Sequence, residues 1–195
     1  MCKIKAQVKN MVSLNPPVCD FGLPATDFDL PGTDGHRHTL ANCRGPNGLL
    51  VMFICNHCPY VKAVIERIVR DTRELAAFGI GSVAIMSNDV ATYPEDSLEH
   101  MTQLAQQLGF PFPYLYDESQ AVARAYDAVC TPDFFGYNGR LELQYRGRLD
   151  ASGRNPNPPD APRELFAAMR QIAKSGQGPT EQTASIGCSI KWRAD

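Results

Sequence analysis

Two cysteines, Cys55 and Cys58, are separated by Asn56 and His57, a spacing that suits redox chemistry. The pair stands between an unbroken apolar run, residues 49–54, and a segment whose apolar residues recur with a helical period. A cysteine at a helix N-terminus faces unpaired backbone N–H groups and the positive end of the helix dipole, and both favour its thiolate. We therefore predict an exposed Cys55 as the nucleophile, Cys58 one turn inside as the resolving thiol, and His57 as a neighbour that stabilises the thiolate.

Zinc and haem are the other groups that cysteines at this spacing bind. A structural zinc site needs four ligands, and the sequence holds no second pair at a similar spacing. Haem attachment needs a histidine directly after the second cysteine, where this chain has Pro59. We predict no metal and no bound cofactor, only a redox-active Cys55–Cys58 disulfide. A zinc-binding structural protein and a non-catalytic interaction module on the same fold stay as alternatives.

Seven cysteines are an odd number, so they cannot all pair within one chain. Cys130 and Cys188 are isolated in the sequence, and isolated cysteines are most often small buried apolar residues. Cys188 lies near the C-terminus, from which it could reach Cys130 or the Cys55–Cys58 pair. Cys130 and Cys188 are therefore candidate accessory thiols.

A second group of residues with a chemical role is Thr131-Pro132, directly ahead of an apolar segment. Proline is tolerated at the first residue of a strand. A cis bond there would turn the Thr131 backbone toward the cysteine pair, where it could bind an extended substrate chain. Only about 5–6% of X–Pro bonds are cis in folded proteins, so this prediction depends on the nearby Cys55–Cys58 motif.

The elements that must position these residues alternate between strands and helices. The predicted elements are a hairpin at 26–40, a strand at 49–54, a helix from 59 to about 78, a strand at 82–86, a helix at 94–108, a strand at 114–116, a helix at 119–126, a hairpin at 133–145 and a helix from 162. Strand, helix and strand in close succession form a βαβ unit. The order predicts an α/β fold in which helices flank a central mixed sheet, with a β-hairpin as an N-terminal extension. We expect one domain over 1–195, in which 1–23 is an irregular arm with at most a short strand and 175–195 an irregular tail.

Composition excludes several other classes of protein. The 195 residues carry 19 basic and 21 acidic side chains, and 44% are hydrophobic, which is ordinary for a globular protein. The near-neutral charge without a basic run argues against nucleic acid or an anionic membrane as a partner. No apolar stretch approaches the roughly 20 residues of a membrane span, and no apolar signal region follows the start. We expect a cytoplasmic protein.

Several motifs resemble those of the thioredoxin-like superfamily, in particular its redoxin branch, which includes alkyl hydroperoxide reductase/thiol-specific antioxidant proteins. The matching segments are Pro24–Gly35, Phe53–Lys62, Ser87–Asp89, Cys130–Phe135 and Gly187–Trp192. More narrowly, they resemble bacterial thioredoxin-family, peroxiredoxin-like proteins, and the likeness covers the chain from about Pro24 to Trp192. The resemblance implies a thioredoxin-like fold, Cys55 as nucleophile, Cys58 as resolving cysteine and Pro132 as a cis-proline. It also implies an antioxidant or redox-homeostasis role, with thiols and disulfides of proteins or small molecules as partners.

The chain departs from both branches of that superfamily. Thioredoxins carry a buried acid six residues before the first cysteine, where this chain has Leu49. Peroxiredoxins carry a proline and a Thr or Ser seven and three residues before the peroxidatic cysteine. Those positions are Gly48 and Met52 counted from Cys55, or Val51 and Cys55 counted from Cys58. We therefore expect a thiol–disulfide oxidoreductase, with a peroxidase that uses Cys55 on a peroxide substrate as the alternative.

Overall fold

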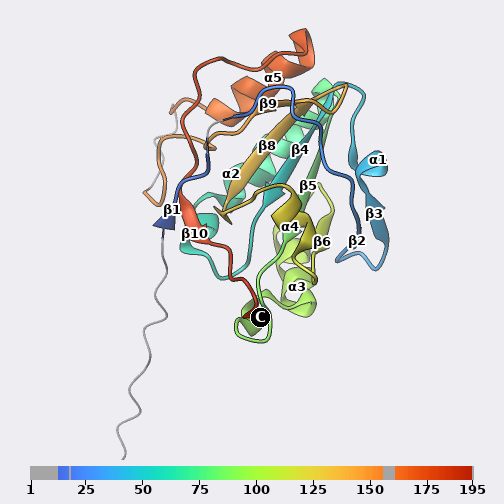
Figure 1. The fold of residues 1–195 in the computed structure, drawn as a ribbon, viewed down its shortest axis with the longest axis vertical. Helices are drawn as coiled ribbons and strands as arrows, with labels where there is room; N and C mark the ends of the chain where they lie inside the picture. Colours follow the sequence, from blue (N-terminus) through green and yellow to red (C-terminus); the bar gives the residue numbers. More distant parts are fainter. Residues whose placement is uncertain (1–12, 18, 156–160, 195) are drawn as a thin grey trace, which may run out of the picture.

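The computed structural model describes residues 13–17, 19–155 and 161–194, and a mixed β-sheet lies at its centre (Figure 1). The strands of this sheet are β4 (Gly48–Phe53), β5 (Ile80–Met86), β6 (Tyr114–Tyr116), β8 (Asp133–Asn138) and β9 (Leu143–Tyr145). β8 pairs antiparallel with β4 and β9, whereas β5 pairs parallel with β6. β5 lies beside β4, where the Ile54 N–H donates to the Ile85 carbonyl at 3.1 Å. Every residue of β4 is buried, as predicted for a strand covered on both faces.

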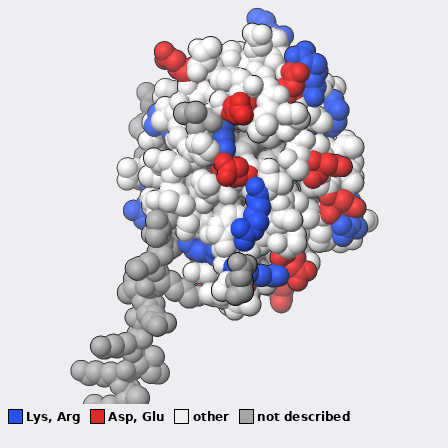
Figure 2. Space-filling model, viewed as in Figure 1, with Lys and Arg blue, Asp and Glu red and all other residues white. Residues whose placement is uncertain are grey.

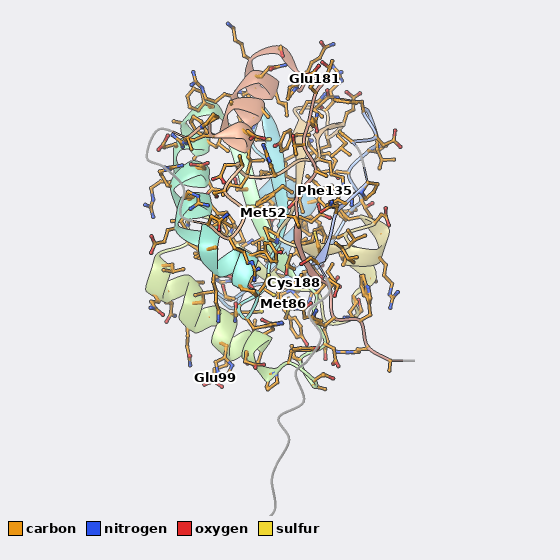
Figure 3. All side chains as sticks on the ribbon, turned by 90° about the vertical axis from the view of Figure 1, so that its left-hand side faces the viewer. Met52, Met86, Glu99, Phe135, Glu181 and Cys188 are labelled. Carbon is orange, nitrogen blue, oxygen red and sulfur yellow. The ribbon has the colours of Figure 1, made fainter. Side chains whose placement is uncertain are left out.

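Helices cover both faces of the sheet (Figures 1 and 3). One face packs against α2 (Pro59–Leu75), α3 (Leu98–Leu108) and α5 (Glu164–Ser175), and the other against α1 (Leu40–Cys43) and α4 (Ala121–Ala125). Alternate residues of β4 serve the two cores: Leu50 and Met52 face the first, and Val51 and Phe53 face the second. The predicted α/β fold, with helices flanking a central mixed sheet, is confirmed.

Both predicted hairpins are present. β2 (Asp29–Pro31) pairs antiparallel with β3 (Arg37–Thr39), and β8 turns back into β9. Among the described residues, no helix is both long and apolar enough to cross a membrane. On the face seen in Figure 2, basic and acidic side chains are interspersed, and no patch of a single sign gathers there.

The helix predicted from residue 94 begins later than the sequence indicates. Pro94–Asp96 forms a short 3₁₀ turn, η2, and α3 starts only after Ser97, whose side chain accepts the His100 N–H. Ser97 has an extended backbone, which separates the two elements, because an N-cap residue lies outside the helical conformation. A second 3₁₀ turn, η1 (Ala76–Phe78), extends α2, and α5 begins at Glu164 rather than at residue 162.

The C-terminal tail, predicted to be irregular, contains a strand. β10 (Gly187–Ser189) pairs antiparallel with β1 (Ser13–Leu14) on one side and with β7 (Cys130–Thr131) on the other. β1 agrees with the short strand expected in the arm, of which residues 1–12 and 18 lie outside the described part. Apolar residues alternate in the tail at Ile186, Cys188, Ile190 and Trp192, a pattern typical of a strand that the prediction of an irregular tail does not use. Pairing with β1 and β7 sets its register.

Candidate functional site

Cys55 and Cys58 lie between the end of β4 and the first turn of α2. Cys58 is the N-cap residue of α2, and Pro59 occupies its first turn. The two thiols are buried: Cys55 is 1% exposed and Cys58 0%. The sequence predicts an exposed Cys55 at the helix start. The structure corrects this, because the helix begins at Pro59 and Thr131 Oγ1 lies 3.4 Å from Cys55 Sγ.

The two thiols differ in acidity, and in the opposite sense to the sequence prediction. Burial raises the pKa of Cys55 well above its ordinary value, and the Cys58 thiol and the Asp96 carboxylate raise it further. The pKa of Cys58 is lowered, because the thiols of Cys188 and Cys55 donate hydrogen bonds to it and the Val61 N–H favours its thiolate. The cysteine that caps the helix is therefore the more acidic one.

Asp96 is a buried carboxylate that fixes the loop between the cysteines. It is 0% exposed, and its Oδ1 accepts the backbone N–H groups of Asn56 at 2.8 Å and His57 at 3.2 Å. Its Oδ2 lies 2.6 Å from His57 Nδ1 and accepts the Asn88 side-chain amide at 2.8 Å. Four donors therefore compensate the burial of this carboxylate.

His57 is oriented by Asp96 rather than by the thiols. Its Nδ1 is 2.6 Å from Asp96 Oδ2 but 3.9 Å from Cys55 Sγ, so its proton points to the carboxylate. The ring stacks on Tyr93 with centroids 5.0 Å apart and planes inclined by 10°. The sequence predicts direct stabilisation of a Cys55 thiolate by His57. The structure instead gives His57 a closer partner, which weakens any interaction with Cys55.

Thr131 and Pro132 reach the cysteine pair, as the sequence predicts, and their peptide bond is cis. The Cys58 thiol donates to the Thr131 carbonyl at 3.1 Å, and a hydrogen bond with Thr131 is among the contacts that lower the pKa of Cys58. The Thr131 backbone, expected to be open to a substrate chain, is paired with Cys188 of β10. Gly187 allows this approach, because a Cβ at that position would stand 2.2 Å from the Thr131 carbonyl oxygen.

Two further motifs of the sequence meet beside the pair. The Lys191 N–H donates to Asn88 Oδ1 at 2.9 Å, and the Lys191 carbonyl accepts the Asp89 N–H at 2.8 Å. Gln120 Nε2 also donates to the Lys191 carbonyl, at 2.9 Å. The tail is thereby joined to the end of β5, and Asn88 links it to Asp96.

The two candidate accessory thiols occupy different environments. Cys188 is 2% exposed and shares a hydrogen bond with the Cys58 thiol. Cys130 is 0% exposed, and its thiol donates to the Pro132 carbonyl at 3.5 Å. Cys130 pairs across the strands with Ser189, and Cys188 with Thr131, so the two cysteines face opposite sides of the ladder. Of the two, only Cys188 is in hydrogen-bond contact with the Cys55–Cys58 pair among the described residues.

Among the described residues, Cys55, His57 and Asp96 form a group that could hold a metal ion, since their ligand atoms lie within 4.8 Å of one another. Thiolate, imidazole and carboxylate are all zinc ligands. However, His57 Nδ1 and both oxygens of Asp96 are already hydrogen-bonded, so coordination would break those bonds. The absence of a metal stays a prediction.

Asp96 was not among the residues that the sequence singled out. Pro94 and the acids after it fit the first turn of a helix, and this pattern gives no sign that Asp96 turns inward. Asn88 and Lys191 lie in segments that resemble the redoxin branch, and this resemblance is the only feature of the sequence that points to them.

Comparison with known proteins places this geometry in a family. The AhpC/TSA family matches residues 21–151, which include the cysteine pair, Asp96 and Thr131-Pro132. The chain belongs to the AhpC/TSA family. Membership confirms the resemblance to the thioredoxin-like redoxin branch and supports a redox function.

Solved structures agree with this membership. An uncharacterized conserved protein from Geobacillus kaustophilus is 42% identical, with a TM-score of 0.90 over 95% of this chain and 99% of that one. A hypothetical protein from Sinorhizobium meliloti 1021 is 40% identical, with a TM-score of 0.87 over 93% and 99%. A thiol:disulfide interchange protein of the thioredoxin family from Chlorobium tepidum TLS shares the fold at 18% identity, with a TM-score of 0.56 over 77% and 93%. A comparison of the chain with curated proteins found no match.

Proposed function

We propose that the protein is a thiol–disulfide oxidoreductase whose Cys55 and Cys58 alternate between dithiol and disulfide. The observation that carries this proposal is the hydrogen bond between the two thiols at the N-terminus of α2, with the lowered pKa on Cys58. Two thiols in contact titrate as a pair. Loss of the first proton leaves a thiolate on Cys58 that accepts a hydrogen bond from the Cys55 thiol. Family membership supports the same class of chemistry.

The Cys58 thiolate can therefore accept the proton of Cys55, the kind of proton transfer for which thioredoxins use a buried acid. Cys55 attacks one sulfur of a substrate disulfide and passes its proton to the Cys58 thiolate, so that a mixed disulfide forms on Cys55. The departing substrate thiolate takes the proton from Cys58. Cys58 then attacks the Cys55 sulfur, which forms the Cys55–Cys58 disulfide and releases the second half of the substrate as a thiolate. Cys58 thus acts first as base and then as resolving nucleophile.

The substrates we propose are disulfides of proteins or small molecules, in the cytoplasm. A pocket of about 100 Å³ lies beside the cis-proline, lined by Tyr60, Val64, Pro132 and Ile186 among others. Its apolar lining suits a side chain or small group next to the substrate disulfide. Because β10 covers the Thr131 backbone, an extended substrate must displace it or bind through this pocket.

Trapping of mixed disulfides tests the proposed order of attack. Cys58→Ser should accumulate mixed disulfides with a model protein disulfide, whereas Cys55→Ser should accumulate none. Cys130→Ser keeps both active thiols and serves as the matched control, which should turn over without trapping. Trapping by Cys55→Ser but not by Cys58→Ser would reverse the assignment, and trapping by neither would refute the proposed exchange.

A thiol peroxidase is the second candidate, and one contact favours it. Thr131 Oγ1 lies 3.4 Å from Cys55 Sγ, so a hydroxyl reaches the cysteine although the sequence lacks one three residues before it. Attack of Cys55 on a peroxide would give a sulfenic acid and an alcohol or water, and Cys58 would then form the disulfide with loss of water. Hydrogen peroxide consumption with a thiol reductant tests this. Thr131→Val should lower the rate and Thr131→Ser should keep it, and a wild-type rate no faster than that of Cys55→Ser would refute the peroxidase.

A further inference from the structure

We propose that Cys188 is a third redox cysteine, which attacks the Cys55–Cys58 disulfide at the Cys58 sulfur and forms a Cys58–Cys188 disulfide. This inference rests on the proposed redox function of the pair. It goes beyond that function because it says which cysteine of the same chain reacts next with the Cys55–Cys58 disulfide.

Cys188 reaches the pair through the strand that carries it. β10 pairs with β7 so that Cys188 lies directly across from Thr131, the residue that contacts both active-site sulfurs. Figure 3 shows Cys188 beside the lower end of α2 as drawn there, the end at which Cys58 caps the helix. The Cys188 thiol shares a hydrogen bond with the Cys58 thiol and receives one from the Tyr60 N–H. β10 thus occupies the edge at which the sequence predicts a substrate strand, and it presents a thiol there.

Cys58 is the common partner of the other two sulfurs. It is hydrogen-bonded to Cys55 on the side of the loop and to Cys188 on the side of the tail. A thiol already in hydrogen-bond contact with one sulfur of a disulfide needs little movement to attack it. Cys130 has no such contact among the described thiols, since its thiol bonds to the Pro132 carbonyl on the other face of the ladder.

Oxidation of the pair makes Cys188 easier to ionise. In the dithiol state the pKa of Cys188 is raised, chiefly because its thiol donates to Cys58, and next because of burial. When Cys58 enters a disulfide it can no longer be a thiolate, so the first of these causes disappears. The positive charge of Lys191 and the Tyr60 N–H, which lower the pKa, remain. Cys188 is therefore a weak nucleophile while the pair is reduced and a stronger one once it is oxidised.

The exchange needs no reagent from outside the chain. The Cys188 sulfur bonds to the Cys58 sulfur, the Cys55–Cys58 bond breaks, and Cys55 leaves as a thiolate that takes up the proton lost by Cys188. The number of disulfides stays at one, and the two-electron oxidation moves from the 55–58 pair to the 58–188 pair. Cys55 is then a thiol again, while β10 is covalently joined to the start of α2.

Disulfide mapping of the oxidised protein tests this proposal. The full chain is oxidised with oxidised glutathione, quenched in acid and digested with trypsin, which leaves Cys55 and Cys58 in peptide 45–62 and Cys188 in peptide 175–191. We expect the cross-linked peptide 45–62/175–191 in wild type and in Cys130→Ser, and its loss in Cys188→Ser. Fragmentation of the cross-linked wild-type peptide should place the cross-link on Cys58 and leave Cys55 as the free, alkylated thiol.

Alkylation of the oxidised protein is the second readout. In wild type, Cys55 should be labelled in proportion to the cross-linked peptide, and in Cys188→Ser it should stay protected in the Cys55–Cys58 disulfide. A wild-type digest with peptide 45–62 oxidised internally and no cross-link would refute the role of Cys188 while leaving the proposed function intact. A digest with neither disulfide would refute the proposed function itself. Should Cys188→Ser fail to fold, the wild-type digest still decides, since a cross-link carried by Cys55 with Cys58 left free contradicts the proposal.

Discussion

Two segments cover the cysteine pair, and they are held in place by different forces. The η2 turn carries Asp96, a fully buried carboxylate that binds the loop between the cysteines through backbone and side-chain donors. β10 is held by backbone pairing with β7, at a distance that only a glycine at position 187 allows. The first segment therefore depends on one charge, and the second on the shape of the backbone.

The two segments also act on different thiols. Burial chiefly raises the pKa of Cys55, the hydrogen bond with Cys58 comes next, and the Asp96 carboxylate raises it further. β10 brings Cys188 into hydrogen-bond contact with Cys58, which lowers the pKa of Cys58. The acidity of the pair is therefore set by burial together with a carboxylate contact on the Cys55 side and by a sulfur contact on the Cys58 side. Each side can be altered separately.

Removal of the Asp96 carboxylate should have the largest effect. Asp96→Ala leaves four donors without their acceptor, and each buried polar group left without a partner costs about 1–3 kcal/mol of unfolding free energy. Urea unfolding measures this. The control is Asp29→Ala, which breaks the exposed Asp29–Arg37 ion pair and should cost less than about 1 kcal/mol. Equal losses in the two variants would show that Asp96 does not hold the loop.

A side chain at position 187 should loosen the tail but not the loop. In Gly187→Ala the added Cβ would stand 2.2 Å from the Thr131 carbonyl oxygen, so β10 must move away from β7. Overpacking of this kind costs about 1–3 kcal/mol. Iodoacetamide should label the two active-site thiols faster in this variant than in wild type. Glu181→Ala, at an exposed residue of the same tail, should leave the labelling rate unchanged. Unchanged labelling in Gly187→Ala would mean that β10 does not cover the pair.

The lowered pKa of Cys58 has a consequence for pH dependence. A group whose pKa is lower in the folded than in the unfolded protein stabilises the fold above its unfolded pKa, and this stabilisation is lost as pH falls through the folded pKa. The stability of wild type relative to Cys58→Ser should therefore decrease from about pH 9 downward. Thiolate absorbance near 240 nm should persist below neutral pH in wild type and Cys130→Ser and disappear in Cys58→Ser. Retention of that absorbance in Cys58→Ser would place the thiolate elsewhere.

Replacement of His57 should have the smallest effect. Its Nδ1 is 2.6 Å from Asp96 and 3.9 Å from Cys55 Sγ, so a positive charge on the ring would be balanced by the carboxylate. His57→Gln should shift the reduction potential of the pair by less than about 30 mV, which is about 1.4 kcal/mol. His100→Gln on α3 is the matched control. A larger shift to more negative potentials would support the sequence prediction that His57 stabilises the thiolate directly.

The fold could be predicted from the sequence because its signals are local. The apolar run of β4 and the helical period of α2 each identify an element without knowledge of its neighbours. The Cys55–Cys58 pair and Thr131-Pro132 were found in the same way, from short motifs with a physical role.

The remaining parts of the site depend on contacts between distant residues. Asp96 looks like an acid in the first turn of a helix, and only the extended backbone at Ser97 turns it toward His57. β10 has only three residues, and its partners β1 and β7 come from distant parts of the chain, so the alternation of Ile186, Cys188 and Ile190 does not show where the strand pairs. The shift of the low pKa from Cys55 to Cys58 follows from the same contacts, since Cys188 comes from the far end of the chain.

A redox titration of the pair tests the central claim most directly. The protein is equilibrated in buffers of increasing ratio of oxidised to reduced glutathione, quenched in acid, and the thiols of peptide 45–62 are counted by alkylation and mass. We predict that Cys55 and Cys58 lose their reduced dithiol state in a single two-electron transition, which is absent in Cys55→Ala/Cys58→Ala and unchanged in Cys130→Ser. Thiols of the pair that stay reduced across the whole series, or that acquire only glutathione adducts, would contradict a Cys55–Cys58 redox couple.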